Sequence, residues 1–330
     1  MRVAVLGAGA WGSALAINLS TRHQISLWTK DPDHAIEMDS QRTNQSFLPG
    51  YAFPEFLKIT SVLNEALSAA DLALIVVPIA GLRETLRAIA ASKIKVPIIW
   101  GCKGFESETS YLPHQVVEEE YSALLQYCGV LSGPSFAEEV AHGLPTALTL
   151  ASKDTDFSNK IAADLHSSRL RIYTSQDIIG VETGGAVKNV ITIAAGISDG
   201  VGFGHNARAA LITRGLMEIT RLGLGLGGSM ETFMGLAGVG DLILTSTGDL
   251  SRNRRVGLML AEGKSLHDIL NELGHVAEGV HTAKSVLQLG NKLNIEMPIT
   301  QAVCSILHEG VSARNAVEVL LNREQKTEIY

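Results

Sequence analysis

The 330-residue sequence predicts an α/β fold in which an N-terminal doubly wound parallel sheet is followed by an all-α C-terminal domain. Two observations lead to this prediction. In the first half of the chain, short runs rich in Val, Ile and Leu alternate with helical stretches, which is the order of a sheet covered by helices. From Asp177 onward the strand-like runs end and helical patterns take over. We therefore expect one domain over residues 1–185 and an all-helical domain over residues 186–330.

The predicted elements follow one another in a regular order. The first strand covers residues 1–6, whose apolar side chains suit a strand buried on both faces, and the small and apolar residues 13–19 predict a buried helix. Further strands are predicted at residues 24–28, 71–78, 96–100, 130–132, 146–150 and 170–173. In the C-terminal domain, Asn206 and Ser265 each precede a helical run, so we expect them to begin helices.

The chain between the first strand and the first helix reads Gly7-Ala8-Gly9-Ala10-Trp11-Gly12. In such a turn, Gly7 permits the tight bend, Gly9 lets the backbone approach a pyrophosphate, and Gly12 lets the helix pack closely on the strand. The helix N-terminus adds free N–H groups and partial positive charge. The turn therefore predicts a Rossmann-type domain that binds a dinucleotide. The alternatives are a purely structural turn and a signal peptide, although three glycines would weaken the helix that a signal peptide needs.

Composition argues against several other functions. The net charge of −7 leaves no basic stripe for a nucleic acid, and no apolar run reaches the length of an uninterrupted membrane span, so we expect a soluble protein. The cysteines, Cys102, Cys128 and Cys304, are odd in number and lie outside any Cys-x-x-Cys pair, which favours a reducing compartment and hence the cytoplasm. The ten histidines show no zinc-binding spacing, so we expect no metal.

The tip of the second predicted strand bears on the choice of cofactor. Lys30 places a cation where the 2′-phosphate of NADP would lie, and Asp31 could accept the ribose 2′-hydroxyl of NAD. We therefore expect NADP to be favoured and NAD to be tolerated. The alternative is that Lys30 is a solvated lysine in a turn.

Two lysines are candidates for chemistry. Lys188 has small or apolar neighbours on every side, and desolvation lowers the pKa of a lysine, so that it can donate a proton to a carbonyl oxygen and take it back. Lys103 follows a predicted strand, where doubly wound sheets bind their ligands. Two cations close together would depress each other's pKa and jointly stabilise an alkoxide-like oxygen. The alternative for each is a surface lysine with an apolar stem.

Polar residues of the C-terminal domain predict a site for a phosphate. Asp241 lies in an apolar, glycine-rich stretch, and Ser251-Arg252-Asn253-Arg254-Arg255 gathers cations and hydrogen-bond donors at a predicted helix start. An arginine, a serine hydroxyl and an asparagine amide can surround one phosphate dianion, although a solvated basic cluster is the alternative. In the first domain, Gly133 and Ser135 form another turn after a strand that could touch substrate or nicotinamide.

Together, these motifs resemble those of the NAD(P)-dependent sn-glycerol-3-phosphate dehydrogenase family in its bacterial biosynthetic form. The motifs are Gly7-Ala8-Gly9-Ala10-Trp11-Gly12, Trp100-Gly101-Cys102-Lys103-Gly104, Ser132-Gly133-Pro134-Ser135-Phe136-Ala137, Gly185-Ala186-Val187-Lys188-Asn189, Gly240-Asp241-Leu242, Ser251-Arg252-Asn253-Arg254-Arg255 and Glu278-Gly279. The resemblance implies an oxidoreductase that transfers hydride reversibly between NAD(P)H and dihydroxyacetone phosphate. Its product, sn-glycerol 3-phosphate, would supply glycerophospholipid synthesis.

The resemblance also implies roles for single residues. The catalytic lysine falls on Lys188 and the second active-site lysine on Lys103, and we expect Asp241 to help hold the charge state of the lysine. The expected substrate contacts are Lys103, Gly133, Ser135, Lys188, Asn189, Asp241, Ser251, Arg252 and Asn253. The expected cofactor contacts are Gly7, Gly9, Ala10, Trp11, Gly12, Lys30, Lys103, Ala137, Arg252, Val276 and Glu278. Ala10 replaces a frequent serine of the family, and Lys30 stands where arginine or histidine is usual.

Two other functions stay open at this point. A 3-hydroxyacid dehydrogenase of the same architecture would recognise a carboxylate, and the Ser251-Arg252-Asn253 cluster weighs against it. A catalytically silent dinucleotide sensor would have no need of Lys103, Lys188 and Asp241 together. For the assembly, we expect a homodimer through the helical domain.

Overall fold

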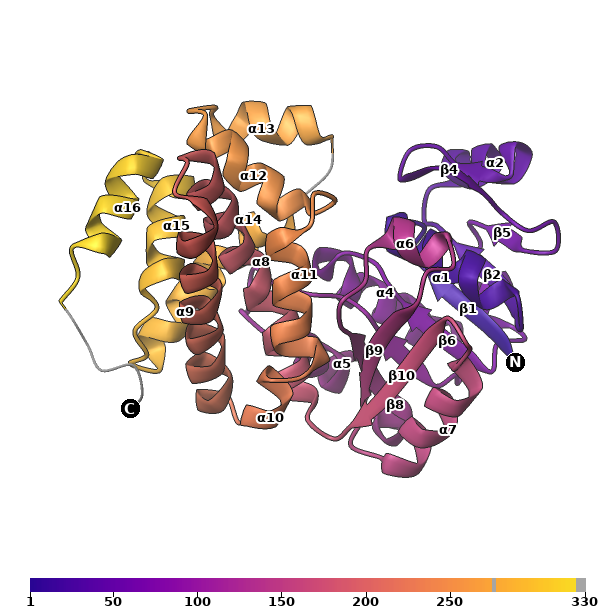
Figure 1. Cartoon of the computed structure of the whole chain (residues 1–330). Helices are drawn as coiled ribbons and strands as arrows, with labels where there is room; N and C mark the ends of the chain where they lie inside the picture. The colour runs from indigo at the N-terminus through magenta and orange to yellow at the C-terminus, as the bar shows by residue number, and fades with distance from the viewer. Residues whose placement is uncertain (275–276, 325–330) are drawn as a thin grey trace.

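The computed structural model describes residues 1–274 and 277–324, and Figure 1 shows a sheet domain beside a helical one. In this part of the chain, eight strands form one sheet in the order β10-β9-β8-β7-β6-β1-β2-β5. The strands are β1 (Arg2–Leu6), β2 (Gln24–Trp28), β5 (Lys58–Thr60), β6 (Leu72–Ile75), β7 (Ile98–Trp100), β8 (Cys128–Ser132), β9 (Thr146–Ala151) and β10 (Leu170–Ser175). Neighbouring strands are parallel, except that β8 and β9 are antiparallel. The predicted α/β fold is confirmed, with this one departure from a wholly parallel sheet.

Both faces of the sheet are buried, as the apolar composition of its strands predicts. On β1, Val3 and Val5 belong to an apolar cluster with side chains of α1 and α7, whereas Ala4 and Leu6 belong to a cluster with side chains of α4 and α5. The helices of this domain are α1 (Ala10–Ser20), α2 (Pro32–Gln41), α3 (Leu63–Leu67), α4 (Ile79–Ser92), α5 (Pro113–Glu120), α6 (Ala137–Ala141) and α7 (Thr155–Leu165), with the 3₁₀ turn η1 (Ser122–Tyr127). Alternate residues of a strand point to opposite faces, so one strand anchors two layers of helices.

The sequence reading missed the short strands β3 (Thr43–Asn44), β4 (Leu48–Ala52) and β5. β4 contains a proline and a glycine and is mostly exposed, so it lacks the apolar alternation that identifies a strand. β3 and β4 pair with each other in a separate antiparallel hairpin.

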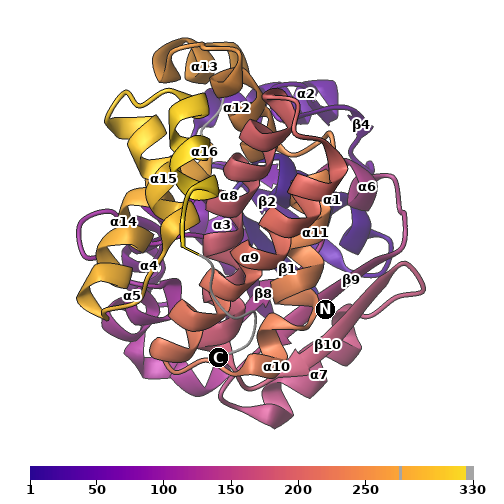
Figure 2. The ribbon, with the colours of Figure 1, turned by 60° about the vertical axis from the view of Figure 1, so that its left-hand side comes forward.

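The C-terminal domain is helical and is organised around one long helix, α8 (Ile178–Gly200). The remaining helices are α9 (Gly204–Gly225), α10 (Met230–Phe233), the π-helical turn η2 (Leu236–Gly240), α11 (Asp241–Thr247), α12 (Arg252–Ala261), α13 (Leu266–Leu273), α14 (Glu278–Lys292), α15 (Pro298–His308) and α16 (Ala313–Leu321). Figure 2 shows α9, α11 and α12 grouped about α8. α8 continues unbroken through residue 185, so the division of the domains at residues 185 and 186 falls inside a helix and stays a prediction.

Two predicted helix starts have different outcomes. Ser265 caps α13, because its hydroxyl accepts a hydrogen bond from the backbone N–H of Asp268, and this prediction is confirmed. Asn206 is not a cap, because α9 begins two residues earlier at Gly204. Gly202 and Gly204 both have positive φ, which lets the chain turn sharply out of α8 and start the next helix sooner than the apolar pattern indicates.

α8 is also the one helix of the described chain that is long and apolar enough to cross a membrane. Of its most apolar window, 94% is buried inside the protein. Such burial is the pattern of a core helix, because a helix that is apolar on every side packs against neighbours on every side.

Candidate active site

The glycine-rich turn between β1 and α1 is built by close backbone packing. Gly7 has φ +119°, and a Cβ there would lie 2.9 Å from the carbonyl carbon of Val76. A Cβ at Gly12 would collide with the carbonyl oxygen of Gly7. A Cβ at Gly9 would meet no protein atom within 4 Å. The fold therefore needs glycine at positions 7 and 12, whereas position 9 faces the space where a pyrophosphate is expected.

A residue that the sequence reading missed holds this turn in place. The buried side-chain amide of Asn44 donates hydrogen bonds from Nδ2 to the carbonyl oxygen of Ala8 at 2.9 Å and to Oγ of Ser13 at 2.8 Å. Its Oδ1 accepts from the backbone N–H of Phe47 and faces Nε2 of His34, both at 3.2 Å. With Nε2 of His34 assigned as the donor to Oδ1, all four hydrogen-bonding positions of the amide are in use. No sequence motif includes Asn44, because it lies in a two-residue strand within a polar segment.

At the tip of β2, the two residues expected to face the cofactor ribose differ in their surroundings. Asp31 caps α2, accepting hydrogen bonds from the backbone N–H groups of Asp33 and His34. Lys30 is exposed, and its Nζ lies 3.9 Å from Oε2 of Glu84, which is also exposed. An exposed ion pair at that distance restrains the lysine little. The role of Lys30 toward a 2′-phosphate stays a prediction.

Three of the predicted residues meet in one buried cluster between the domains. Nζ of Lys103 lies 2.7 Å from Oδ2 of Asp241, and Nζ of Lys188 lies 2.5 Å from Oδ1 of the same carboxylate. The side chains of Asp241 and Lys188 are 1% and 5% exposed, and that of Lys103 is 21% exposed. One carboxylate therefore bridges two ammonium groups, and Lys103 is the member closer to solvent.

Burial and charge set the protonation of this cluster. Burial and the positive charge of Lys103 lower the pKa of Lys188, the negative charge of Asp241 opposes them, and the result is a pKa of about 8. Burial acts to raise the pKa of Asp241, but the charges of Lys103 and Lys188 outweigh it, and the net shift is downward. Near neutral pH, Asp241 is therefore an anion, and Lys188 is an acid close to its own pKa.

The packing of η2 on α8 explains how residues so distant in sequence meet. A Cβ at Gly184 would lie 2.5 Å from the carbonyl oxygen of Ala237, so only glycine lets η2 approach this closely. Asp241 follows η2 directly, and Lys188 lies one turn beyond Gly184 on α8. The close approach thus brings the carboxylate to the lysine.

Beside the lysine cluster, polar side chains from α8, α12 and α14 form a second group of hydrogen bonds. Nδ2 of Asn253 donates to Oδ1 of Asn189 at 3.0 Å, and Oδ1 of Asn253 accepts from the backbone N–H of Gly279 at 3.1 Å. Nδ2 of Asn189 lies 3.5 Å from Oε2 of Glu278. Burial raises the pKa of Glu278, while Lys103, Arg252 and Lys188 act in the opposite direction. These cations therefore act on one carboxylate.

The predicted phosphate-binding segment lies at the start of α12. Ser251 is buried and caps this helix, because its hydroxyl accepts a hydrogen bond from the backbone N–H of Arg254 at 3.3 Å. Arg252 is the first residue of the helix and is exposed. The predicted helix start is confirmed, whereas contact with a phosphate stays a prediction.

The predicted site residues of the turn after β8 lie beside the segment that carries Asp241. Gly133 and Ser135 lie in the turn after β8, where Oγ of Ser135 donates to the carbonyl oxygen of Gly133 at 3.1 Å, and Ala137 begins α6. A Cβ at Gly240, the residue before Asp241, would lie 3.7 Å from Pro134 of that turn. The turn is therefore next to the segment that carries Asp241. Val276 lies outside the described residues.

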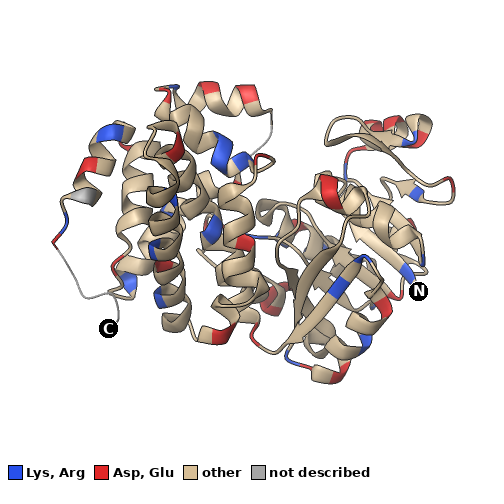
Figure 3. Ribbon diagram, viewed as in Figure 1, with Lys and Arg blue, Asp and Glu red and all other residues tan. Residues whose placement is uncertain are grey.

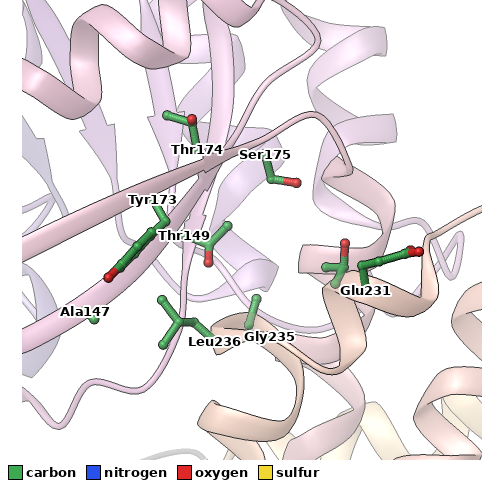
Figure 4. A pocket seen from close by; sticks show the side chains of 10 residues that line it. Ala147, Thr149, Tyr173, Thr174, Ser175, Glu231, Gly235 and Leu236 are labelled. Carbon is green, nitrogen blue, oxygen red and sulfur yellow. The ribbon is translucent and has the colours of Figure 1, made fainter.

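A separate hollow of about 480 Å³ contains none of the predicted site residues. β9 and β10 form one side of it and α10 and η2 the other, as Figure 4 shows. In the described chain, no three His, Cys, Asp or Glu residues are grouped so that they could hold a metal ion. Figure 3 shows Lys and Arg interspersed with Asp and Glu over both domains.

Comparisons with known proteins cover both domains. The N-terminal part of NAD-dependent glycerol-3-phosphate dehydrogenase matches residues 2–158, and the C-terminal part matches residues 177–318. A glycerol-3-phosphate dehydrogenase [NAD(P)+] from Nitrosospira multiformis is 66% identical over the whole of both chains, and one from Nitrosomonas eutropha is 58% identical over 99% of each. A crystal structure of glycerol-3-phosphate dehydrogenase from Coxiella burnetii superimposes with a TM-score of 0.93 at 45% identity, covering 98% of this chain and 99% of that one.

Proposed function

This chain belongs to the NAD-dependent glycerol-3-phosphate dehydrogenase family, and from that premise we propose how its residues carry out the reaction. It is an oxidoreductase that reduces dihydroxyacetone phosphate to sn-glycerol 3-phosphate with NADH or NADPH, a reversible reaction that supplies glycerophospholipid synthesis. The family sets aside both alternatives that the sequence left open, a 3-hydroxyacid dehydrogenase and a silent dinucleotide sensor.

The dinucleotide would be held by the turn that contains Gly7, Gly9 and Gly12. Support comes from the open space at Gly9 and from the first turn of α1, where Ala10 and Trp11 present backbone N–H groups beyond the turn. The first turn of α1 carries no acidic side chain that would repel a pyrophosphate. When bound, the reduced nicotinamide supplies the hydride.

The cluster of Lys103, Lys188 and Asp241 carries the proposal for the chemistry. During reduction, carbon 2 of dihydroxyacetone phosphate gains the hydride, and its carbonyl oxygen takes a proton from Nζ of Lys188. The lysine then regains a proton from solvent, and the reverse reaction returns the proton to it. Asp241 offsets part of the positive charge of the two ammonium groups, and the partly exposed Lys103 contacts the substrate oxygen.

The phosphate of the substrate would bind at the start of α12. Arg252 supplies a guanidinium, Asn253 and Asn189 supply amides, and the helix supplies the N–H groups of its first turn. Ser251 already accepts the capping hydrogen bond, so its hydroxyl proton is free to be donated to a phosphate oxygen. Gly133 and Ser135 would close the site from the sheet domain.

Replacing Lys188 tests the proposed proton donor. The variant Lys188→Ala should lower kcat for dihydroxyacetone phosphate by about 10²- to 10⁴-fold, the usual contribution of a positioned acid. Its affinity for NADPH, measured by fluorescence titration, should stay near that of the wild type. Lys292→Ala, which changes an exposed lysine at the end of α14, is the control and should keep full activity. A Lys188→Ala enzyme with wild-type turnover would remove Lys188 from the mechanism.

We propose further that the enzyme is a cytoplasmic homodimer formed through the helical domain. Large apolar side chains are exposed along the segment from α9 to α12, which supports an interface there. They are Phe203, Leu224, Met230, Met234, Ile243 and Leu250. The cysteines Cys102, Cys128 and Cys304 are buried free thiols, which supports a reducing compartment. Light scattering on the purified enzyme tests the dimer.

A further inference from the structure

A buried carboxylate that the mechanism does not use joins the two domains beside the active site. The Glu182 side chain, on α8, has 0% exposure. Its Oε1 accepts hydrogen bonds from Nε1 of Trp100 at 2.7 Å and from the backbone N–H of His114 at 2.8 Å. Its Oε2 lies 2.5 Å from Nδ1 of His114, which we assign as a donor because it faces a carboxylate. One side chain of the helical domain thus holds two segments of the sheet domain.

The position of Glu182 relates it to both lysines. Trp100 ends β7, and Lys103 follows three residues later. Glu182 lies on the same helix as Lys188, six residues before it. Between them, a Cβ at Gly185 would lie 3.6 Å from the side chain of Lys103. The part of α8 that bears Glu182 and Lys188 therefore packs directly on the segment that bears Lys103.

We propose that Glu182 is a positioning residue, which fixes α8 against the end of β7 so that Lys103 and Lys188 reach the two oxygens of Asp241. Three directed hydrogen bonds to two separate segments restrain both rotation and sliding of the helix, which apolar contacts alone do less well. Burial of a carboxylate is costly unless the group is paired and hydrogen-bonded, and Glu182 meets this condition only through Trp100 and His114 of the sheet domain. The inference rests on the proposed function, because it requires that the two lysines act on the substrate.

Burial acts to lower the pKa of His114, but the hydrogen bond and negative charge of Glu182 outweigh this effect and raise it. Burial also raises the pKa of Glu182, while the hydrogen bonds from His114 and Trp100 act in the opposite direction. The two groups therefore depend on each other through one hydrogen bond inside the protein. Replacing Glu182 by glutamine keeps the size of the side chain but removes the charge that His114 faces. The variant Glu182→Gln is consequently a sharp probe of the contact.

The chain offers a matched control in Glu218, a second buried carboxylate with three hydrogen bonds. Its oxygens accept from the backbone N–H of Ile299 at 2.6 Å and from the backbone N–H and Oγ1 of Thr300 at 3.1 and 2.9 Å. It thereby satisfies N–H groups in the first turn of α15, within the helical domain, and makes none of the contacts of the lysine cluster. Glu218→Gln disturbs the fold to a similar extent without touching the join between the domains.

The experiment compares Glu182→Gln and Glu218→Gln in the full-length enzyme. Both should lower Tm, but only Glu182→Gln should lower kcat, by about 10- to 100-fold, because small misplacements of catalytic groups cost this much. The KM for NADPH should be unchanged in both. If Glu182→Gln loses stability as Glu218→Gln does and keeps wild-type kcat, the proposal is wrong. His114→Gln, which keeps the backbone hydrogen bond, decides the matter if Glu182→Gln does not fold: a lowered kcat supports the proposal, and a wild-type kcat overturns it.

A double-variant cycle separates positioning from a purely structural role. If Glu182 acts through Lys103, Glu182→Gln should lower the residual rate of Lys103→Met less than it lowers the wild-type rate. Equal losses in both backgrounds would refute action through Lys103. Lys188→Ala, assayed alongside, keeps the two proposals apart. A Lys188→Ala enzyme with wild-type turnover removes Lys188 from the proposed mechanism, whereas an inactive one beside a fully active Glu182→Gln overturns only the role of Glu182.

Discussion

The two ends of the candidate active site consist of different chemical groups. The cofactor end consists of the glycine-rich turn and the uncharged amide of Asn44, which donates to the carbonyl oxygen of Ala8. The substrate end consists of buried charges, in which Asp241 bridges Lys103 and Lys188. The dipoles of backbone groups do not change with pH. At the substrate end, the protonation of each charged side chain depends on the charges of its neighbours. The enzyme should therefore lose turnover and cofactor binding through separate sets of changes.

After the loss of Lys188 itself, the largest expected effect comes from removing the shared carboxylate. Asp241→Asn should lower kcat by about 10²-fold, because the two ammonium groups lose the charge that holds them in place. The same change removes an interaction that raises the pKa of Lys188. Binding of NADPH should change little, since the cofactor end does not use this charge. A parallel loss of NADPH affinity would show that the two ends are not independent.

The pH dependence of kcat tests how Asp241 changes the pKa of Lys188. In the proposed mechanism reduction needs protonated Lys188, so kcat for reduction should fall as the pH rises through about 8, the pKa of that lysine, while the oxidation rate should rise. In Asp241→Asn, the fall should move to lower pH, because the neighbouring negative charge is gone. Rates of both directions, measured between pH 6 and pH 10 in buffers of constant ionic strength, provide the check. An unchanged midpoint would mean that another group donates the proton.

A smaller effect is expected at the predicted phosphate-binding segment. Arg252→Ala should raise the KM for dihydroxyacetone phosphate by about 10- to 100-fold, the value of one hydrogen-bonded charge contact. Arg255→Ala is the matched control, because Arg255 is an exposed arginine on the same helix. Steady-state kinetics at saturating NADPH separate KM from kcat. Equal KM values for Arg252→Ala and its control would rule out the proposed phosphate contact.

The difference between the two ends also explains what the sequence could predict. The glycine-rich turn is local, since six consecutive residues define its geometry, and the cap at Ser251 is local too. Lys188 and Asp241 stand out singly because apolar residues surround them, but their contact spans 53 positions, and that of Lys103 with Asp241 spans 138. Spacing along a chain does not encode such contacts. Their assignment to one site came from the resemblance to a family.

Asn44 and Glu182 show where sequence reasoning ends. Each is a polar residue that forms hydrogen bonds to segments distant in the sequence. Neither belongs to a sequence motif of known function. Asn44 reaches a turn 36 positions away, and Glu182 reaches Trp100 across 82 positions. Only the folded chain shows that all the hydrogen-bonding positions of Asn44 are occupied. Positioning residues of this kind are found from saturated buried networks rather than from motifs.

The smallest expected effect lies at the far tip of the cofactor end, where a charge is added to a site otherwise built from backbone. Lys30→Ala should raise the KM for NADPH a few-fold and leave the KM for NADH unchanged, because an exposed cation contributes about 1 kcal/mol or less. The effect should shrink as salt screens the charge. Lys93→Ala, at the end of α4, controls for loss of any lysine from this domain. If both cofactors lose affinity equally, Lys30 shapes the turn rather than contacting a 2′-phosphate, and the prediction that NADP is favoured loses this support.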